Sequence, residues 1–178
     1  MADHVDSIVE QWGRQRPDLD VSALALLGRL FRVAHLADAV LTRGLDGYAI
    51  QPGWLDLLAA LRRAGPPHEL SPTELMRATL LSSGGMTKRL DRLAEQQLVT
   101  RRPDPSDRRG TLVRLTRHGK ALIDKALETH IDNEQRLLAH LSDPERRRLD
   151  TLLRKLLEAL EPLPSRRHAG HGLGPRKP

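Results

Sequence analysis

The chain has 178 residues, a formal net charge of +6, 2% aromatic residues and no cysteine. This length suits one domain with a sizeable core, and the shortage of aromatics favours helices packed through leucine and alanine over a β-sandwich. The lack of cysteine excludes disulfides, thiolate metal sites and sensing by cysteine oxidation. Acidic residues interrupt the N-terminus and no apolar run is long enough to span a bilayer, so we expect a cytoplasmic protein without signal peptide or membrane contact.

The first third of the sequence predicts three helices. A short amphipathic helix within residues 1–15 belongs to an N-terminal extension, residues 1–20, and carries Val5, Ile8, Val9 and Trp12 at helical spacing. A long helix over about residues 21–43 follows, in a segment (residues 21–50) that we assign to dimerisation. Glycine and proline then break the pattern before a helix over residues 54–64, which Gly65-Pro66-Pro67 ends.

Two helices joined by a turn are predicted between residues 71 and 97. Ser71-Pro72-Thr73-Glu74 is a capping box with proline at the first helical position. The second helix, roughly residues 83–97, has one apolar stripe, and Ser82 or Ser83 is suited to cap it. The stripe consists of Met86, Leu90, Leu93 and Ala94. The opposite face consists of Ser83, Gly84, Thr87, Lys88, Asp91 and Arg92, and Arg89 lies near the edge of that face.

The small residues at the start of this second helix would let its backbone approach bases in the major groove of DNA. We expect Ser83, Thr87 and Lys88 to face the major groove and Arg92 to lie nearer phosphate. The alternative is an ordinary amphipathic surface helix whose charges are merely solvated, and the helix alone does not decide between the two.

A basic hairpin follows and favours DNA binding. Residues 98–102 and 111–116 are short β-type runs, and the loop between them contains Asp107-Arg108-Arg109. We expect Arg109 to enter the minor groove with Arg108 beside it and Asp107 orienting a guanidinium. Residues 77–120 hold eleven Lys/Arg against four Asp/Glu, a net charge of +7 by subtraction, so the excess positive charge of the chain is concentrated here. The order of parts is that of a winged helix-turn-helix.

The sequence resembles the multiple-antibiotic-resistance regulator (MarR) family over roughly residues 22–160. The segments that carry the resemblance are Leu70–Leu75, Gly85–Leu93, Asp107-Arg108-Arg109, Leu115-Thr116 and Gly119. The resemblance implies a mainly α fold with a small β-hairpin wing and a winged helix-turn-helix over residues 54–118. It also implies a homodimer that binds a pseudo-palindromic double-stranded DNA operator and represses transcription until a small ligand releases it.

The C-terminal third predicts two further helices, over about residues 121–141 and from Ser142 or Asp143 onward. The last helix has a leucine ridge made of Leu149, Leu152, Leu153, Leu156, Leu157 and Leu160. A monomer could fold this ridge back on the first long helix, but we favour dimerisation through the N- and C-terminal helices, which assigns residues 119–161 to C-terminal dimerisation helices. Residues 162–178, rich in Pro, Gly, His and Arg, predict a disordered basic tail.

No catalytic, metal or cofactor site is expected. The eight histidines are scattered without three or four convergent partners, and the sequence has no nucleophile elbow and no phosphate-binding glycine loop fed by a strand. We therefore interpret the chain as non-enzymatic.

Within the resembled family, a urate-responsive subgroup has an extra N-terminal helix, and its pocket residues correspond to Trp12, Asp56, Arg89 and Arg101 here. Urate is a planar anion near neutral pH, so an arginine fork suits its acidic edge and an indole suits its face. An Asp56–Arg101 pair would link this pocket to the wing. Each residue also has an ordinary explanation in packing, surface pairing or phosphate contact, and citrate-like, aconitate-like or phenolic ligands remain alternatives.

Three classes of function therefore compete. The favoured one is a ligand-responsive transcriptional repressor. The second is a constitutive winged-helix protein that binds DNA without ligand control. The third is a protein–protein module that has kept the fold, which the basic Asp107–Arg109 wing disfavours.

Overall fold

The computed structural model describes residues 2–79, 85–107 and 110–161. Three of the predicted DNA contacts, Ser83, Arg108 and Arg109, lie outside these ranges, as do the predicted turn at residues 80–83 and the predicted tail. The chain forms two compact units that divide between Leu137 and Leu138.

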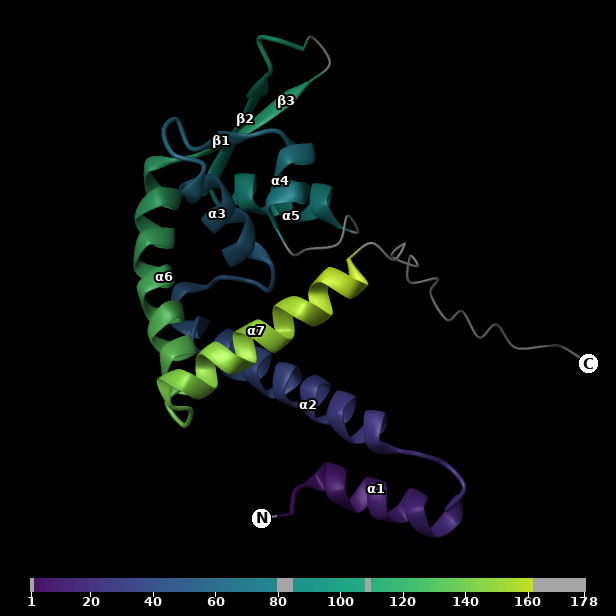
Figure 1. The fold of residues 1–178 in the computed structure, drawn as a ribbon. Coiled ribbons are helices and arrows are strands. Elements are labelled where there is room, and N and C mark those ends of the chain that lie inside the picture. The colour runs from purple at the N-terminus through teal and green to yellow at the C-terminus, as the bar shows by residue number, and fades with distance from the viewer. Residues whose placement is uncertain (1, 80–84, 108–109, 162–178) are drawn as a thin grey trace, which may run out of the picture. The chain divides into compact units, whose positions relative to one another are not determined.

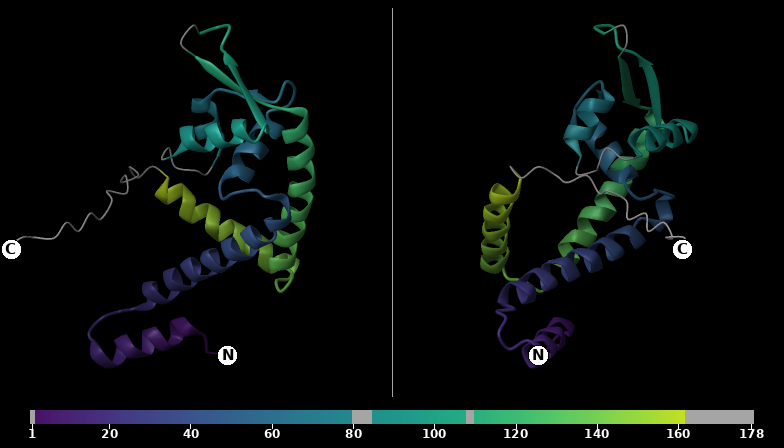
Figure 2. Two further views of the ribbon diagram at one scale, coloured as in Figure 1. Left: turned by 180° about the vertical axis from the view of Figure 1, so that it is seen from behind. Right: turned by 90° about the vertical axis from the view of Figure 1, so that its right-hand side faces the viewer.

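The first unit is mainly helical with a small antiparallel sheet, which confirms the predicted fold class (Figures 1 and 2). Its elements in chain order are α1 (His4–Gln15), α2 (Ser22–Arg43), the 3-10 turn η1 (Asp46–Tyr48), α3 (Trp54–Arg63), β1 (Glu69–Leu70), α4 (Pro72–Ala78), α5 (Met86–Glu95), β2 (Val99–Pro103), β3 (Thr111–Leu115) and α6 (Arg117–Leu137). The sheet has the order β1-β3-β2, with Leu70 opposite Val113 and Arg101 opposite the same valine. The sequence analysis missed β1, which is only two residues long.

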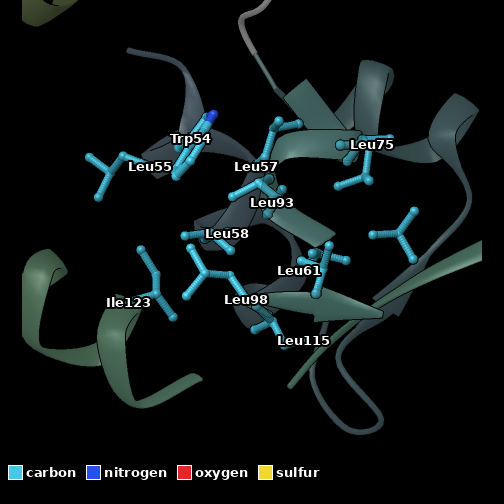
Figure 3. Close-up of a cluster of buried hydrophobic side chains, with 14 of the residues drawn as sticks. Trp54, Leu55, Leu57, Leu58, Leu61, Leu75, Leu93, Leu98, Leu115 and Ile123 are labelled. Atoms are coloured by element: carbon cyan, nitrogen blue, oxygen red, sulfur yellow. The ribbon is translucent and has the colours of Figure 1, made fainter. Parts of the chain in front are cut away.

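Helix α3 lies at the centre of the core (Figure 3). Its Leu57, Leu58 and Leu61 are completely enclosed, and side chains from the helix-turn-helix, the sheet and α6 surround them. Leu75 of α4, Leu93 of α5, Val113 of β3 and Ile123 of α6 are likewise fully buried. Burying this much apolar surface fixes α4, α5 and the sheet on one support, so the elements expected to bind DNA form one body.

The N-terminal helix α1 packs on α2. Asp3 caps α1 through the backbone N–H groups of Val5 and Asp6, and Arg29 of α2 forms ion pairs with both aspartates. Val5 is buried against Gly28, where a side chain would come within 3.3 Å of the valine methyl. The predicted N-terminal helix is therefore present and attached to α2.

Helices α2 and α7 carry large apolar side chains on their surfaces. No residue of α2 is buried, and its Leu26, Phe31 and Val33 are 66%, 67% and 64% exposed. The second unit contains α7 (Asp143–Leu160), which Ser142, one of the two expected caps, begins by forming a capping box with Glu145; no residue of α7 is buried. Along the described stretches of the chain, every helix is too short or too polar to cross a bilayer.

Two helix boundaries differ from their predictions. Helix α5 begins at Met86 rather than near residue 83, and its N-cap is Gly85 rather than a serine, because Gly85 has a φ of +79° that a helix cannot contain. Helix α6 begins at Arg117 instead of residue 121, because the Thr116 hydroxyl accepts the Gly119 N–H at 2.8 Å and so caps the helix earlier.

Candidate nucleic-acid interface

The first helix of the helix-turn-helix is fixed by the capping box predicted from the sequence. The Ser71 hydroxyl oxygen accepts the Glu74 N–H at 3.3 Å, and Glu74 Oε2 accepts the Ser71 N–H at 2.8 Å. The Ser71 N–H and, next in effect, the Ser71 hydroxyl both donate to the Glu74 carboxylate, and these bonds hold the pKa of Glu74 below its usual value. Buried Leu75 then anchors α4 in the core.

The second helix, α5, separates its two faces as predicted. Met86, Leu90 and Leu93 are buried, whereas Thr87, Lys88, Asp91 and Arg92 are exposed and Arg89 is half-buried. The apolar face packs on the α3 core, and the polar face is therefore directed away from it. Helix α5 thus presents a basic face of the kind that enters a major groove.

The sheet beside α5 is held by an ion pair that crosses it. Arg102 of β2 donates two bonds, of 2.7 and 2.6 Å, to the carboxylate of Glu69 on β1. The Glu69 side chain is 8% exposed, and the hydrogen bond from Arg102 holds its pKa below the usual value. The sequence analysis did not single out Glu69, since β1 had no pattern long enough to reveal a strand.

The described part of the wing loop is ordered by Asp104 and Gly110. The Asp104 carboxylate accepts the Ser106 N–H at 2.8 Å and the Ser106 hydroxyl at 2.6 Å. The Gly110 carbonyl oxygen accepts the Asp104 N–H, and the Gly110 N–H donates to the Asp107 carbonyl oxygen. A Cβ at Gly110 would lie 2.9 Å from the Asp104 Cβ. The two arginines between Asp107 and Gly110 lie outside the described residues, so their expected contacts stay predictions.

Arg101 connects β2 to α5. Its Nη1 lies 2.7 Å from Asp91 Oδ1, and its Nη2 donates to the Thr87 carbonyl oxygen at 3.4 Å. The predicted Asp56–Arg101 pair is therefore wrong for the single subunit. The physical reason is that Arg101 lies on the face of β2 that α5 covers, where Asp91 is within reach.

Two cavities lie next to each other near α5 and share Gln51 and Pro52 in their walls. The first, of about 380 Å³, includes Asp38, Asp56 and His130 among its lining residues. The second, of about 320 Å³, is lined by Gln51, Pro52, Trp54, Gly85, Lys88, Arg89 and Arg92. Gln51 also accepts a hydrogen bond of 3.1 Å from Arg92, so it directly contacts α5, the helix that we expect to be the recognition helix.

The four predicted ligand residues do not come together in either of these two cavities. Asp56 lies in the first cavity and Arg89 in the second. Trp12 is 43% exposed on α1, and Arg101 is engaged by Asp91; neither lines these two cavities. Gln51 and Trp54 were not predicted from the sequence as cavity residues, although Pro52 and Gly53 do mark a loop after Gln51.

Among the residues with described positions, no group of three His, Asp or Glu side chains is arranged to hold a metal ion.

Comparison with known proteins supports the interpretation of this surface. The chain is 38% identical over 149 residues to the HTH-type transcriptional regulator PecS of Dickeya dadantii, an alignment that covers 84% of this chain and 90% of PecS. The sequence model of the MarR family matches residues 48–110, which include α3 to α5 and the hairpin up to Gly110. The chain belongs to the MarR family.

Solved structures of MarR-family proteins share its fold. A mutant of Escherichia coli MarR, solved in complex with operator DNA, is 32% identical, with a TM-score of 0.68, and the alignment covers 77% of this chain and 97% of that one. The Bordetella bronchiseptica protein BpsR, whose DNA binding is regulated by 6-hydroxynicotinic acid, is 26% identical with a TM-score of 0.66, and the alignment covers 72% of this chain and 90% of that one. This MarR-family protein is therefore a DNA-binding transcriptional regulator and not an enzyme.

Proposed function

We propose that this MarR-family protein is a homodimeric repressor that a small anionic ligand, urate in the first instance, releases from a pseudo-palindromic operator. One observation carries the proposal: Lys88, Arg89 and Arg92 line a cavity and also belong to the helix that reads DNA. A ligand that occupies this cavity meets the same cations that phosphates and bases would meet.

The composition of the cavity favours an anion. Its described lining residues include three basic side chains and no acidic one, and it adjoins the N-terminus of α5, where backbone N–H groups attract negative charge. Trp54, which is 4% exposed, also borders the cavity and adds apolar surface to its wall. The neighbouring cavity is a poorer site for an anion, because Asp38 and Asp56 contribute two carboxylates to it.

Release follows from competition for these cations. A ligand shifts an equilibrium only by the difference in its affinity for the two states, and here the DNA-bound state has its cations engaged by phosphates. An anion that binds the free protein more tightly than the DNA complex must weaken DNA binding by the same factor. Gln51 lines both cavities and accepts a hydrogen bond from Arg92, so a ligand in either cavity would lie next to a residue in direct contact with α5.

Dimerisation is supported by the exposed apolar side chains of α2 and α7. Leu26, Phe31 and Val33 on α2 and Leu152, Leu157 and Leu160 on α7 are all more than half exposed. Large exposed apolar side chains in this number are typical of helices that bury them against a partner subunit. A two-fold dimer would place two α5 helices in major grooves about one turn of DNA apart.

The identity of the ligand rests on chemistry common to several candidates. Urate, hydroxylated aromatic acids such as the 6-hydroxynicotinic acid named for BpsR, and citrate-like or aconitate-like carboxylates are all anions that three cations would attract. Phenolic ligands would use the apolar surface of the wall more than the cations. We assign Arg101 no direct ligand contact, because Asp91 and the Thr87 carbonyl already engage its guanidinium. Trp12 and Asp56 remain candidates that require separate tests.

The experiment has two parts. Fluorescence anisotropy with labelled DNA from upstream of the protein's own gene, at physiological salt and with excess non-specific competitor, establishes whether an operator is bound. Urate, citrate, salicylate and 6-hydroxynicotinate are then titrated into the complex. Release by urate at sub-millimolar concentration supports the full proposal, and release by another anion corrects the ligand. A specific complex that ignores all four overturns ligand-controlled release and favours constitutive binding.

Calorimetric titration of the protein with urate in the absence of DNA tests whether urate binds in the cavity that Lys88, Arg89 and Arg92 line. The Arg89→Ala variant should lose urate binding, whereas Arg77→Ala, which removes the same charge from exposed α4, should keep it. Trp12→Phe and Asp56→Asn test the other two candidates in the same way. Equal affinity in Arg89→Ala and the parent protein would exclude this cavity.

A further inference from the structure

Arg101 lies on the covered face of the wing sheet. In β2, alternate side chains share a face, and Arg101 comes two residues after Val99, which is buried. Its partner in the ladder is Val113, which is completely enclosed. Arg102, on the opposite face, binds Glu69 instead. The two adjacent arginines therefore have different surroundings, although they look equivalent in the sequence.

The guanidinium of Arg101 joins two successive turns of α5. It contacts the Asp91 carboxylate at 2.7 Å and the Thr87 carbonyl oxygen at 3.4 Å, and these residues are four positions apart on one side of the helix. The Arg101 and Asp91 side chains are 33% and 48% exposed, so solvent screens this ion pair, and its effect is geometric, as a link between two elements. Through it, the middle of the wing strand is connected to the exposed face of the recognition helix.

An acidic residue on the DNA-facing side of a recognition helix needs an explanation. Asp91 lies between Lys88 and Arg92, where a carboxylate would repel nearby phosphates. If electrostatic attraction to DNA were its only effect, Asp91 would reduce affinity. Its contact with Arg101 provides another effect, which is to hold α5 and β2 at one mutual orientation.

We propose that Arg101 and Asp91 are positioning residues, which fix the orientation of the recognition helix relative to the wing so that both engage one operator at once. Specific binding requires major-groove and wing contacts to be in register, whereas non-specific binding requires only positive charge. Loss of the pair therefore lowers affinity for the operator and does not lower affinity for unrelated DNA. The proposal rests on the family's DNA binding and is independent of the ligand.

The Asp91→Asn variant gives the sharpest test, because the two explanations predict opposite signs. Removal of a negative charge beside the phosphates should tighten binding to every DNA if Asp91 has no positioning role. The proposal predicts instead that operator affinity falls by about tenfold, within the range expected when contacting residues are uncoupled. Glu95→Gln removes the same charge from the last turn of α5 and serves as the control. Tighter operator binding by Asp91→Asn would overturn the proposal.

The Arg101→Gln variant separates positioning from direct phosphate contact. A phosphate-binding arginine weakens binding to all sequences and lowers the slope of log K against log salt by about one. The proposal predicts that Arg101→Gln loses operator affinity with an unchanged slope and unchanged affinity for random DNA. Arg114→Gln, which removes the same charge from the neighbouring strand β3, serves as the control. Uniform weakening with a reduced slope would overturn the proposal.

A double-mutant cycle completes the test. If the two side chains act as one unit, Asp91→Asn/Arg101→Gln binds the operator no more weakly than the worse single variant. Additive losses would overturn the proposal, because they would show two independent effects. Thermal unfolding and binding to random DNA are measured for each variant, so that a folding defect, which would weaken both kinds of binding, is recognised.

Discussion

Gly119, in the first turn of α6, lies against the backbone carbonyl of Leu98. A Cβ on Gly119 would lie 2.8 Å from the Leu98 carbonyl carbon and closer still to its oxygen. Thr116 strengthens this junction, because its hydroxyl donates to the Gln97 carbonyl oxygen at 2.7 Å and accepts the Gly119 N–H at 2.8 Å. The start of α6 is thus fixed against the segment that leads from the recognition helix into the wing.

We expect Gly119→Ala to destabilise the protein by about 1–3 kcal/mol, because backbone must move to admit the methyl group. Gly13→Ala is the matched control, since no atom of the described residues lies within 4 Å of a Cβ there and alanine favours the exposed helix α1. Urea unfolding followed by circular dichroism measures both. Equal free energies of unfolding for Gly119→Ala and Gly13→Ala would show that the backbone around Gly119 can move at little cost.

Phe31→Lys should convert the dimer into monomers. The phenylalanine is 67% exposed on α2, and a charge there would be buried without a partner in the interface that we propose. Sedimentation equilibrium measures the change. Leu19→Lys, at a 45% exposed leucine between α1 and α2, should remain dimeric. Monomeric parent protein at micromolar concentration would contradict the dimer itself.

The Glu69–Arg102 pair should make stability depend on pH below neutrality. The hydrogen bond from Arg102 lowers the pKa of Glu69 in the folded state, below its ordinary value of 4.5. The contribution of the pair is therefore fully present above pH 4.5 and is lost as the pH falls toward the folded-state pKa. Glu69→Gln should lower the melting temperature at pH 7 by a few degrees, and the difference from the parent should shrink below pH 4.5. If the difference in melting temperature between Glu69→Gln and the parent protein did not change with pH, the stabilisation would come from packing and not from the ion pair.

Lys88→Gln should weaken binding to operator and random DNA alike. Lys88 is exposed on the basic face of α5, so its loss removes about one phosphate contact and lowers the salt slope by about one. Anisotropy titrations at several salt concentrations measure this slope. Weakening confined to one operator sequence would instead show that Lys88 contacts a base.

Arg109→Ala should weaken specific operator binding by about 1–3 kcal/mol, the usual scale for an arginine that reads DNA. Arg109 lies outside the described residues, so this prediction rests on the sequence of the wing loop. Competition between the operator and a variant with altered sequence under the wing would locate the contact. Unchanged operator affinity would exclude Arg109 from recognition.

Local patterns in the sequence were sufficient to predict most of the fold. The capping box at Ser71 was confirmed because it depends on side chains only three residues apart, and Ser142 is the N-cap of α7, one of the two caps expected there. The apolar stripe of α5 was confirmed because its period follows directly from helix geometry. Strand β1 was missed, since two residues carry no period and its pairing with β3 depends on distant sequence.

The candidate site was less predictable because its contacts join different elements. Lys88 and Arg92 were placed correctly on the exposed face of α5, as a helical pattern allows. The partner of Arg101 was predicted wrongly, because the sequence does not show that β2 crosses α5 next to Asp91. Gln51 and Arg92 are in contact although they are 41 positions apart in the chain, a separation that no local pattern spans.

The two tryptophans of the chain have opposite surroundings, and this makes the protein its own optical probe. Trp54 is 4% exposed and lines the cavity beside α5, whereas Trp12 is 43% exposed on the N-terminal helix. Their emission should consequently differ in colour and in access to a dissolved quencher such as acrylamide. Each tryptophan in turn, isolated by changing the other to phenylalanine, reports on one region alone. Events at the recognition helix and events at the N-terminal extension can thus be timed separately, with no dye attached.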